Sequence, residues 1–343
     1  MTLLRDLRRL GARLMAPVAP VALAAALLTA CGGGTSQVEP FKPERVIALG
    51  DENSVMLDDG SGGSVAGDGV KYTINDRRGT AVGKCATLPS FSQSLASLYG
   101  FAFAQCNPSG GTPKAFIHAV PGARIDNTPT GLAAQIAGVA NLGKTDMVSL
   151  MIGGNDVIEL FESVRDGTRA RAEAISAARQ RGRDAATLVG SILNTGARVL
   201  VVTSPDMGLS PYARTQALTY PDAGPLLSEL SFELNGNLRT NVEPNDGRHW
   251  GLVLADDIVA AMYKLPTSFL VAPSIATEAA CTTVSAKDCV IVDVDANDPS
   301  KVSTLVTGAS AGSHLWADDR HLGPDAHGRI GQQLQSRAVN NPF

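Results

Sequence analysis

The stretch Val46-Ile47-Ala48-Leu49-Gly50-Asp51-Glu52-Asn53-Ser54 decides the fold of this 343-residue chain. Four apolar residues in a row are typical of a strand that is covered on both faces of a parallel sheet. Gly50 suits a sharp turn because it has no Cβ, and the acidic pair that follows suits a helix N-terminus, as does Ser54. In α/β folds, such a turn stands at the carboxyl edge of the sheet, where ligands bind.

Further apolar runs alternate with helical patterns along the rest of the chain. Strands are predicted at residues 115–120, 147–152, 199–202 and 252–254, with a short edge strand at 71–74. Helices are predicted at residues 90–99, 131–142, 157–194, 225–238 and 324–339. This alternation predicts one α/β domain, a three-layer α/β/α sandwich around a mainly parallel five-stranded sheet.

The N-terminus has the pattern of an export signal. A positive region precedes an apolar run at residues 16–28, which is too short for a comfortable membrane span. The run ends in Leu28-Thr29-Ala30-Cys31, which is similar to a bacterial lipoprotein signal in which the cysteine carries the lipid. The alternative is an ordinary secretory signal with Cys31 incidental. We therefore predict a signal peptide over residues 1–30, a flexible tether over 31–43 and the folded domain over 44–343.

The predicted location is the cell envelope, because a lipid on Cys31 would attach the protein to a membrane. Gly32 follows the cysteine, and the absence of aspartate there favours the outer membrane. A periplasmic or secreted protein is the alternative. The formal net charge of −4 and the lack of a basic patch exclude nucleic acid as an expected partner.

Four cysteines remain beside Cys31, and an exported chain meets an oxidising compartment. Three pairings are possible for four cysteines. We favour the two pairs that are close in sequence and lie in loops, Cys85–Cys106 and Cys281–Cys289. A metal site is the rival interpretation, but the spacings lack the tight Cys-x-x-Cys form, so no metal is predicted.

Three further motifs carry residues suited to chemistry. Asp318-x-x-His321 places a carboxylate where it can orient an imidazole, although such pairs are often structural. The sequence Met151-Ile152-Gly153-Gly154-Asn155-Asp156 ends a predicted strand, so Asn155 is a candidate donor to an oxyanion, or else part of a helix cap. Gly122 follows another predicted strand and can offer a backbone N–H, although strand–glycine turns are common.

These motifs together resemble the GDSL/SGNH hydrolases, whose signature begins Gly-Asp-Ser. The four blocks occur in the family's order between residues 46 and 327, although Leu322 stands where the family often has proline. The resemblance implies an SGNH-like, flavodoxin-like fold and ester hydrolysis without a cofactor. It also implies a base at His321 oriented by Asp318, and an oxyanion held by Gly122 and Asn155.

The first block departs from the family at its central residue. Gly50 and Asp51 match, but Glu52 stands at the position of the family's serine, and Ser54 follows two residues later. Three interpretations compete. A reshaped turn can present Ser54 as the nucleophile; Glu52 can fill the site of a protein that only binds or scaffolds; or Glu52 can act as a base or covalent carboxylate beside His321.

We adopt the first interpretation as the expectation from sequence. The chain is expected to be a carboxylic ester hydrolase of the cell envelope that works through Ser54, His321 and Asp318. The alternative is a catalytically inactive binding or scaffolding lipoprotein with Glu52 in the nucleophile position. Acetylated sugars, short acyl esters and phospholipids all fit as substrates, and the sequence indicates no oligomeric state.

Overall fold

The computed structural model describes residues 41–57, 69–79, 84–126, 129–245, 247–293, 298 and 302–340. The predicted signal peptide, Cys31 and most of the predicted tether lie outside these residues. No helix in the described part of the chain combines the length and the apolar character needed to cross a bilayer.

A five-stranded parallel sheet forms the centre of the domain. Its strands, in spatial order, are β5 (Ala115–Ile117), β1 (Arg45–Gly50), β6 (Asp146–Met151), β7 (Arg198–Val202) and β8 (Trp250–Val253). If only these five strands are numbered in chain order, their spatial order is 2-1-3-4-5. This is the flavodoxin-like order, whose switch point lies between the first and the third strand. The predicted fold class is confirmed.

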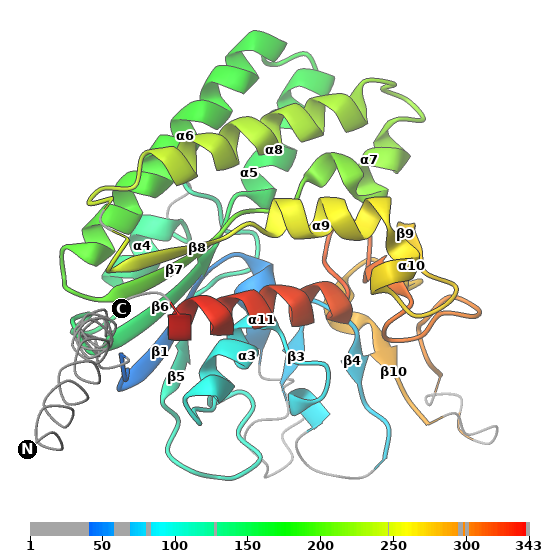
Figure 1. The fold of residues 1–343 in the computed structure, drawn as a ribbon. Helices are drawn as coiled ribbons and strands as arrows, with labels where there is room; N and C mark the ends of the chain where they lie inside the picture. Colours follow the sequence, from blue (N-terminus) through cyan, green and yellow to red (C-terminus); the bar gives the residue numbers. More distant parts are fainter. Residues whose placement is uncertain are drawn as a thin grey trace, which may run out of the picture. The chain divides into compact units, whose positions relative to one another are not determined.

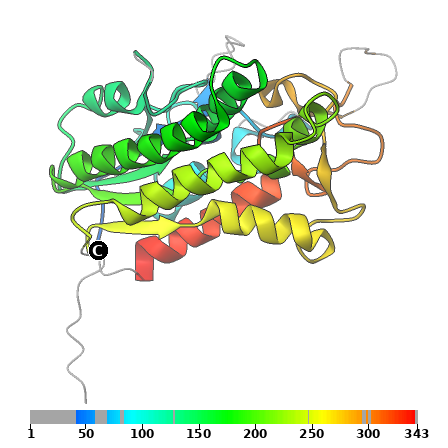
Figure 2. The same ribbon diagram turned by 90° about the horizontal axis from the view of Figure 1, so that it is seen from above.

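Helices cover both faces of this sheet (Figures 1 and 2). One face packs on α4 (Leu132–Ala137), α5 (Gly154–Arg165), α6 (Arg171–Leu193) and α8 (Ala223–Thr240). The other packs on α3 (Phe91–Leu98), α9 (Ala255–Lys264) and α11 (Pro324–Asn340). Side chains alternate across each strand, so Ile47 and Leu49 enter the first core while Val46 and Ala48 enter the second.

Short elements join these layers and carry the loops around the sheet. They are η1 (Glu52–Ser54), β2 (Met56–Leu57), β3 (Val70–Lys71), β4 (Asn75–Asp76), η2 (Lys84–Ala86), η3 (Met207–Leu209), α7 (Pro211–Gln216), α10 (Pro266–Phe269), β9 (Ile275–Ala279), η4 (Ala286–Asp288), β10 (Val290–Ile291) and β11 (His314–Trp316).

Several predicted elements differ in extent from the structure, and the strand expected at 115–120 is only Ala115–Ile117. The single helix expected at 157–194 is wrong, because Gly167 ends α5 with a φ of 70°, and the Glu173 carboxylate accepts from the Ala170 N–H to start α6. The helix expected at 131–142 stops at Ala137, before Gly138. The edge strand expected at 71–74 is only the two-residue β3.

Both favoured disulfide bonds are present. Cys85 and Cys106 are bonded across a Cα–Cα distance of 5.7 Å, and Cys281 and Cys289 across 5.8 Å. The first bond joins η2 to the segment before β5. The second closes a short loop that contains η4, and the pairing expected from sequence proximity is therefore confirmed.

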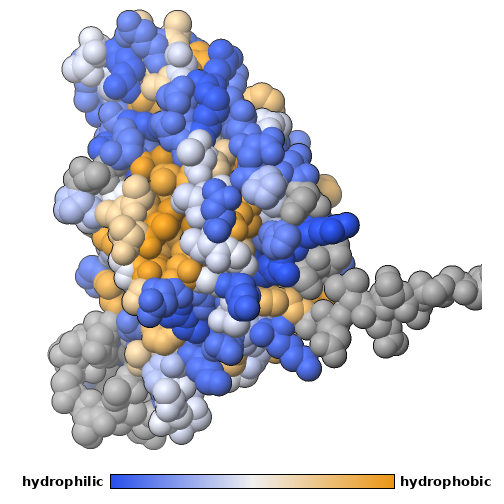
Figure 3. Space-filling view, turned by 90° about the vertical axis from the view of Figure 1, so that its left-hand side faces the viewer, coloured by the Kyte–Doolittle hydropathy of each residue, from blue (hydrophilic) through white to orange (hydrophobic). Residues whose placement is uncertain are grey.

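The surface carries both polar and apolar areas. Figure 3 shows one face on which hydrophobic side chains gather in the middle, between hydrophilic margins. On α6 and α8, charged side chains pair across the helices, as in Arg171–Glu229 and Arg179–Glu233. These exposed arginines lie on the solvated side of α6, whereas Arg181 on the same helix is buried.

The turn at Gly50 gives a direct test of the sheet's central contact. Gly50 has a φ of 121°, and a Cβ there would lie 1.7 Å from the Met151 carbonyl oxygen on the neighbouring strand. We expect Gly50→Ala to lower the free energy of unfolding by more than about 3 kcal/mol, because both the conformation and the space exclude a side chain.

Gly236→Ala is the matched control for this substitution. Gly236 lies within α8, and a Cβ there meets nothing within 4 Å. Alanine should raise the free energy of unfolding by roughly 0.5–1 kcal/mol through its helix propensity. Urea titration measures both changes, and equal stability of Gly50→Ala and the wild type would contradict the described packing.

Candidate functional site

The turn after β1 is fixed by side-chain hydrogen bonds on two sides. The Gln135 amide from α4 accepts from the Gly50 N–H at 2.8 Å and donates to the Gly50 carbonyl at 2.9 Å. Asp51 then caps η1, with its Oδ1 accepting from the Asn53 N–H at 3.1 Å and from the Asn53 side-chain amide at 3.0 Å. Asp51 is thereby turned inward and Glu52 stands at the start of η1.

A small pocket opens at this edge of the sheet, beyond the carboxyl ends of three neighbouring strands. Its lining residues are Asp51, Glu52, Asn53, Gly154, Asn155, Ile158, Pro205, Met207, Arg320 and His321. The pocket therefore joins the turn after β1, the start of α5, the loop after β7 and the segment before α11. This is the location where doubly wound α/β folds place their ligands.

His321 and Asp318 form a buried pair on one side of the pocket. His321 Nδ1 lies 2.7 Å from Asp318 Oδ2, while the Arg320 and His321 N–H groups donate to Asp318 Oδ1 at 2.9 and 2.7 Å. With Nδ1 bonded to the carboxylate, the tautomer is set and Nε2 is left to exchange a proton. The predicted contact between Asp318 and His321 is thus present.

The charges around His321 favour its protonated form. Burial lowers the pKa of His321, but the hydrogen bond that it donates to Asp318 and the negative charges of Asp318, Glu52 and Asp51 outweigh this effect and raise the pKa above its ordinary value. For Asp318, burial raises the pKa, yet the bond to His321 and the backbone donors bring it below its usual range. Burial and the charge of Glu52 raise the pKa of Asp51 to about 7.

Glu52 faces the pocket and is bound to the predicted oxyanion donor. The Asn155 side-chain amide donates to Glu52 Oε2 at 2.7 Å and to the Ala123 carbonyl at 3.2 Å. An amide nitrogen carries only two hydrogens, so both are committed in this arrangement. The helix-cap interpretation of Asn155 does not hold, because α5 begins after Gly153 without a side-chain cap.

Ser54 lies on the other side of the turn. It is 2% exposed, it is not among the residues that line the pocket, and its buried Oγ meets no hydrogen-bond partner within the described residues. In a 3₁₀ helix each residue turns about 120°, so a side chain two positions after Glu52 points elsewhere. The role of Ser54 as nucleophile stays a prediction, which this geometry does not favour.

Gly122 is near the site but outside the pocket lining. It is exposed, with a φ of 74°, in the turn that follows β5. The next residue, Ala123, accepts the hydrogen bond from Asn155, so the turn is tied to α5. The structure therefore brings together Glu52, Asn155 and His321 around one pocket, with Gly122 one residue from this contact and Ser54 apart from it.

Sequence reasoning missed several residues that position the site. Both Asp156 carboxylate oxygens accept from the Ile125 N–H, at 3.2 and 3.1 Å, and Arg181 lies 3.3 Å from the same carboxylate. This contact fixes the loop after β5 against α5. Arg320 lines the pocket, paired with Asp319 at 2.9 Å. A signal for Asp156 was its place beside Asn155, whereas nothing in the sequence distinguishes Gln135 or Arg320.

No group of three or more histidine, cysteine, aspartate or glutamate side chains in the described ranges has an arrangement that could hold a metal ion.

His327, on α11, is a buried histidine whose pKa gives a pH-dependent test. It stacks on Phe91 at a ring-centroid distance of 5.7 Å, and neither ring nitrogen has a hydrogen-bond partner in the part of the chain that the structure describes. Burial, with the charges of Lys71 and His321, lowers its pKa to about 3. The unfolded chain therefore gains a proton below pH 6.5 that the folded protein does not take up.

The wild type should therefore lose stability in acid, and replacement of His327 with phenylalanine should prevent this loss. Because the folded pKa is depressed, the free energy of unfolding falls as the pH drops below 6.5, by about 2 kcal/mol at pH 5. Between pH 8 and pH 5, the wild type should therefore lose about 2 kcal/mol of unfolding free energy that His327→Phe keeps. Urea unfolding at both pH values measures this, and equal pH dependence of the two proteins would contradict it.

His321 thus lines a pocket beside the turn after the first strand of a five-stranded parallel sheet, with Asp318 bonded to its ring. Residues 59–334 match the family model described as GDSL-like Lipase/Acylhydrolase, and the chain belongs to that family. The matched segment begins after residue 58, so the stretch from Val46 to Ser54 lies outside it. Among curated proteins, none matches the chain.

Three solved structures are similar to this chain at low identity. The extracellular lipase from Streptomyces rimosus is 16% identical, with a TM-score of 0.36, covering 63% of this chain and 82% of its own. An acetyl-xylooligosaccharide esterase from Geobacillus is 15% identical, with a TM-score of 0.32, covering 69% and 88%. Phospholipase A1 from Streptomyces albidoflavus NA297 is 13% identical, with a TM-score of 0.36, covering 86% and 98%.

Proposed function

We propose that this protein is a carboxylic ester hydrolase in which Glu52 acts where related enzymes use a serine hydroxyl. The observation that carries the proposal is the placement of the Glu52 carboxylate in the same pocket as His321, while Ser54 is buried elsewhere. Membership of a family of lipases and acylhydrolases supports ester hydrolysis. The raised pKa of His321 supports a role as acid rather than as base in the resting site.

The proposed reaction divides acid and base roles between these two side chains. Glu52 takes a proton from water as the water oxygen attacks the acyl carbon, and His321 gives its Nε2 proton to the departing alkoxide. The products are a carboxylic acid and an alcohol, and the proton on Glu52 returns to His321. As Glu52 becomes neutral it is a weaker acceptor, which releases the Asn155 amide toward the oxyanion.

The test is hydrolysis of p-nitrophenyl acetate by four proteins: the wild type, Glu52→Gln, His321→Ala and Ser54→Ala. The proposal expects release of p-nitrophenol by the wild type and by Ser54→Ala, with loss of about 100-fold or more in the other two variants. Loss in Ser54→Ala with retention in Glu52→Gln would restore Ser54 as the nucleophile and overturn the role of Glu52.

A second candidate function is a non-catalytic binding or scaffolding protein on the same fold. The specific observation in its favour is that both Asn155 amide hydrogens are committed, one of them to Glu52. Rates at background in all four correctly folded proteins would select this function. For the hydrolase, we also propose that the substrates are esters of short acyl groups rather than long ones, because the pocket is small.

We propose further that the protein is exported and attached to the outer membrane by a lipid on Cys31. The two disulfide bonds support an oxidising compartment. We expect Cys31→Ser to move the protein from the membrane fraction to the soluble fraction of a bacterial host, because the anchor is lost. Fractionation and immunoblotting measure the shift, and identical membrane association of the variant and the wild type would contradict lipidation.

A further inference from the structure

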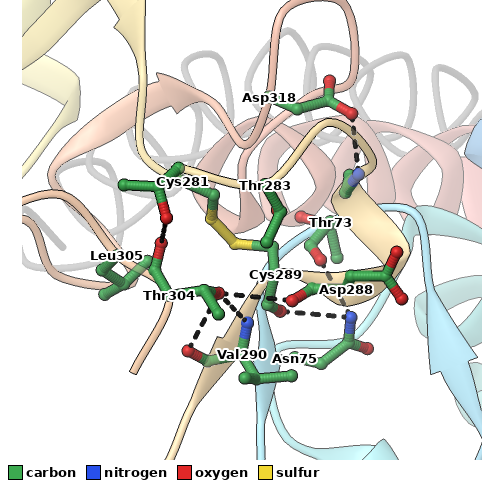
Figure 4. The surroundings of a disulfide bond; sticks show 12 residues. Thr73, Asn75, Cys281, Thr283, Asp288, Cys289, Val290, Thr304, Leu305 and Asp318 are labelled. Atoms are coloured by element: carbon green, nitrogen blue, oxygen red, sulfur yellow. Dashed lines mark hydrogen bonds between the residues drawn. A yellow bond between two sulfur atoms is a disulfide. The ribbon is translucent and has the colours of Figure 1, made fainter. Parts of the chain in front are cut away.

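The loop closed by the Cys281–Cys289 disulfide lies against the residue that orients His321. Asp318 Oδ2 accepts two hydrogen bonds, one with His321 Nδ1 and one from the Ala286 backbone N–H, each at 2.7 Å. Ala286 is the first residue of η4 and lies inside the disulfide loop. Figure 4 shows Asp318 above this loop, with its carboxylate directed to a backbone nitrogen of the loop.

The same loop contacts the chain next to Asp318 at a second point. The Cys281 N–H donates to the Ala317 carbonyl at 3.0 Å, and the Cys289 N–H donates to the Ala286 carbonyl at 3.0 Å. Ala286, Cys289 and Ala317 have no exposed surface. The disulfide therefore links Cys281, which binds the Ala317 carbonyl, to the end of η4. The first residue of η4, Ala286, binds the Asp318 carboxylate.

This arrangement fixes the plane of the carboxylate independently of the imidazole. Asp318 Oδ1 is held by the Arg320 and His321 N–H groups, so an additional donor on Oδ2 leaves the carboxylate no free rotation. Without that donor, the carboxylate can turn or take up water, and the bond to Nδ1 weakens. A hydrogen bond to a charged group is among the stronger ones in proteins, so the loss should be measurable.

We propose that the Cys281–Cys289 loop is a positioning element for the Asp318–His321 pair, acting through the Ala286 N–H. Its catalytic consequence rests on the proposed function, in which His321 transfers a proton. Its structural part, the hydrogen bond between His321 and Asp318, does not depend on activity and can be measured separately.

Ala286→Pro removes this one N–H and leaves both cysteines in place. Proline suits the first residue of a helix, and Ser285 before it is extended, with φ −129° and ψ 133°, as a residue before proline requires. Ala286→Gly is the matched control, because it also changes the buried methyl group but keeps the N–H. Far-UV circular dichroism establishes that each variant is folded.

The first readout is the low-field proton resonance of the His321 Nδ1–H in NMR spectra, and the second is kcat for p-nitrophenyl acetate. We expect Ala286→Pro to lose the resonance through exchange with water and to lower kcat about tenfold relative to Ala286→Gly, with KM unchanged. If the resonance behaves as expected while no variant and no wild type has activity, the positioning role stands and the proposed function fails.

A second comparison decides the matter even if Ala286→Pro does not fold. Cys281→Ser with Cys289→Ser opens the loop, whereas Cys85→Ser with Cys106→Ser removes the other disulfide, which has no bond to Asp318 within the described residues. We expect only the first double variant to lose the His321 resonance. Retention of that resonance in the first double variant, or in Ala286→Pro, would overturn the proposal.

Discussion

Glu52→Ser is expected to raise p-nitrophenyl acetate hydrolysis at least about 100-fold above the wild type. The substitution places a hydroxyl at the first residue of η1, in the pocket that His321 lines. It also releases the Asn155 amide from its 2.7 Å bond to Glu52, so that a donor becomes available to the oxyanion. The site would then hold the serine, histidine and aspartate of an acyl-transfer triad.

The loss of a carboxylate also changes the acid–base state of the site. Glu52 contributes one of the negative charges that raise the pKa of His321, so its removal lowers this pKa and favours the neutral imidazole that a serine nucleophile needs. The activity of Glu52→Ser should therefore appear at a lower pH than it would with the carboxylate present. A pH–rate profile measures this directly.

Two controls separate a new nucleophile from a simple change of charge. Glu52→Ala removes the same charge without adding a hydroxyl, and Glu52→Ser with His321→Ala keeps the hydroxyl without its base. Both are expected to fall at least about 100-fold below the wild-type rate, because the first lacks the carboxylate base and the second lacks both that base and His321. A folded Glu52→Ser protein that is no faster than Glu52→Ala would show that position 52 does not present a side chain to His321.

Asp318→Asn in the Glu52→Ser protein is expected to lower the rate about 1,000- to 10,000-fold. Asp318 accepts every hydrogen bond described for it, from two backbone N–H groups on Oδ1 and from Ala286 and His321 on Oδ2. An asparagine must direct its NH₂ group at one of these donor pairs. The imidazole then loses its partner or takes the wrong tautomer.

The neighbouring residue provides the control for this loss. Asp319 is 41% exposed at its side chain and pairs with Arg320, not with His321. Asp319→Asn removes the same charge one position away, so its rate should stay within about threefold of the parent, as is usual for a surface ion pair. Equal rates for Asp318→Asn and Asp319→Asn would contradict the assignment of Asp318 as the residue that orients the imidazole.

The sheet and most helices could be predicted because their signals are local. The apolar run at residues 46–49 is buried on both sides, as four consecutive apolar residues indicate, and the runs at 147–152 and 199–202 behave alike. Helix ends were less predictable. Gly167 interrupts a continuous helical pattern because its φ is positive, and composition alone does not reveal that conformation.

The contacts of the candidate site could be predicted only between residues that are close together in the sequence. Asp318 and His321 are three residues apart, so their contact follows from local spacing, and both disulfide bonds join cysteines close in sequence. The orientations of Glu52 and Ser54 depend on one turn of 3₁₀ helix, which is set by Asp51 and by Gln135 from a distant helix. Such long-range hydrogen bonds leave no pattern in a single sequence.

Labelling with a fluorophosphonate, a reagent that phosphonylates activated serine hydroxyl groups, tests most directly whether Glu52 and not Ser54 faces His321. Mass spectrometry of the digested protein locates the modified residue. We expect no label on the wild type and a label at position 52 of Glu52→Ser that disappears when His321 is also changed to alanine. A label on Ser54 of the wild-type protein would contradict the account.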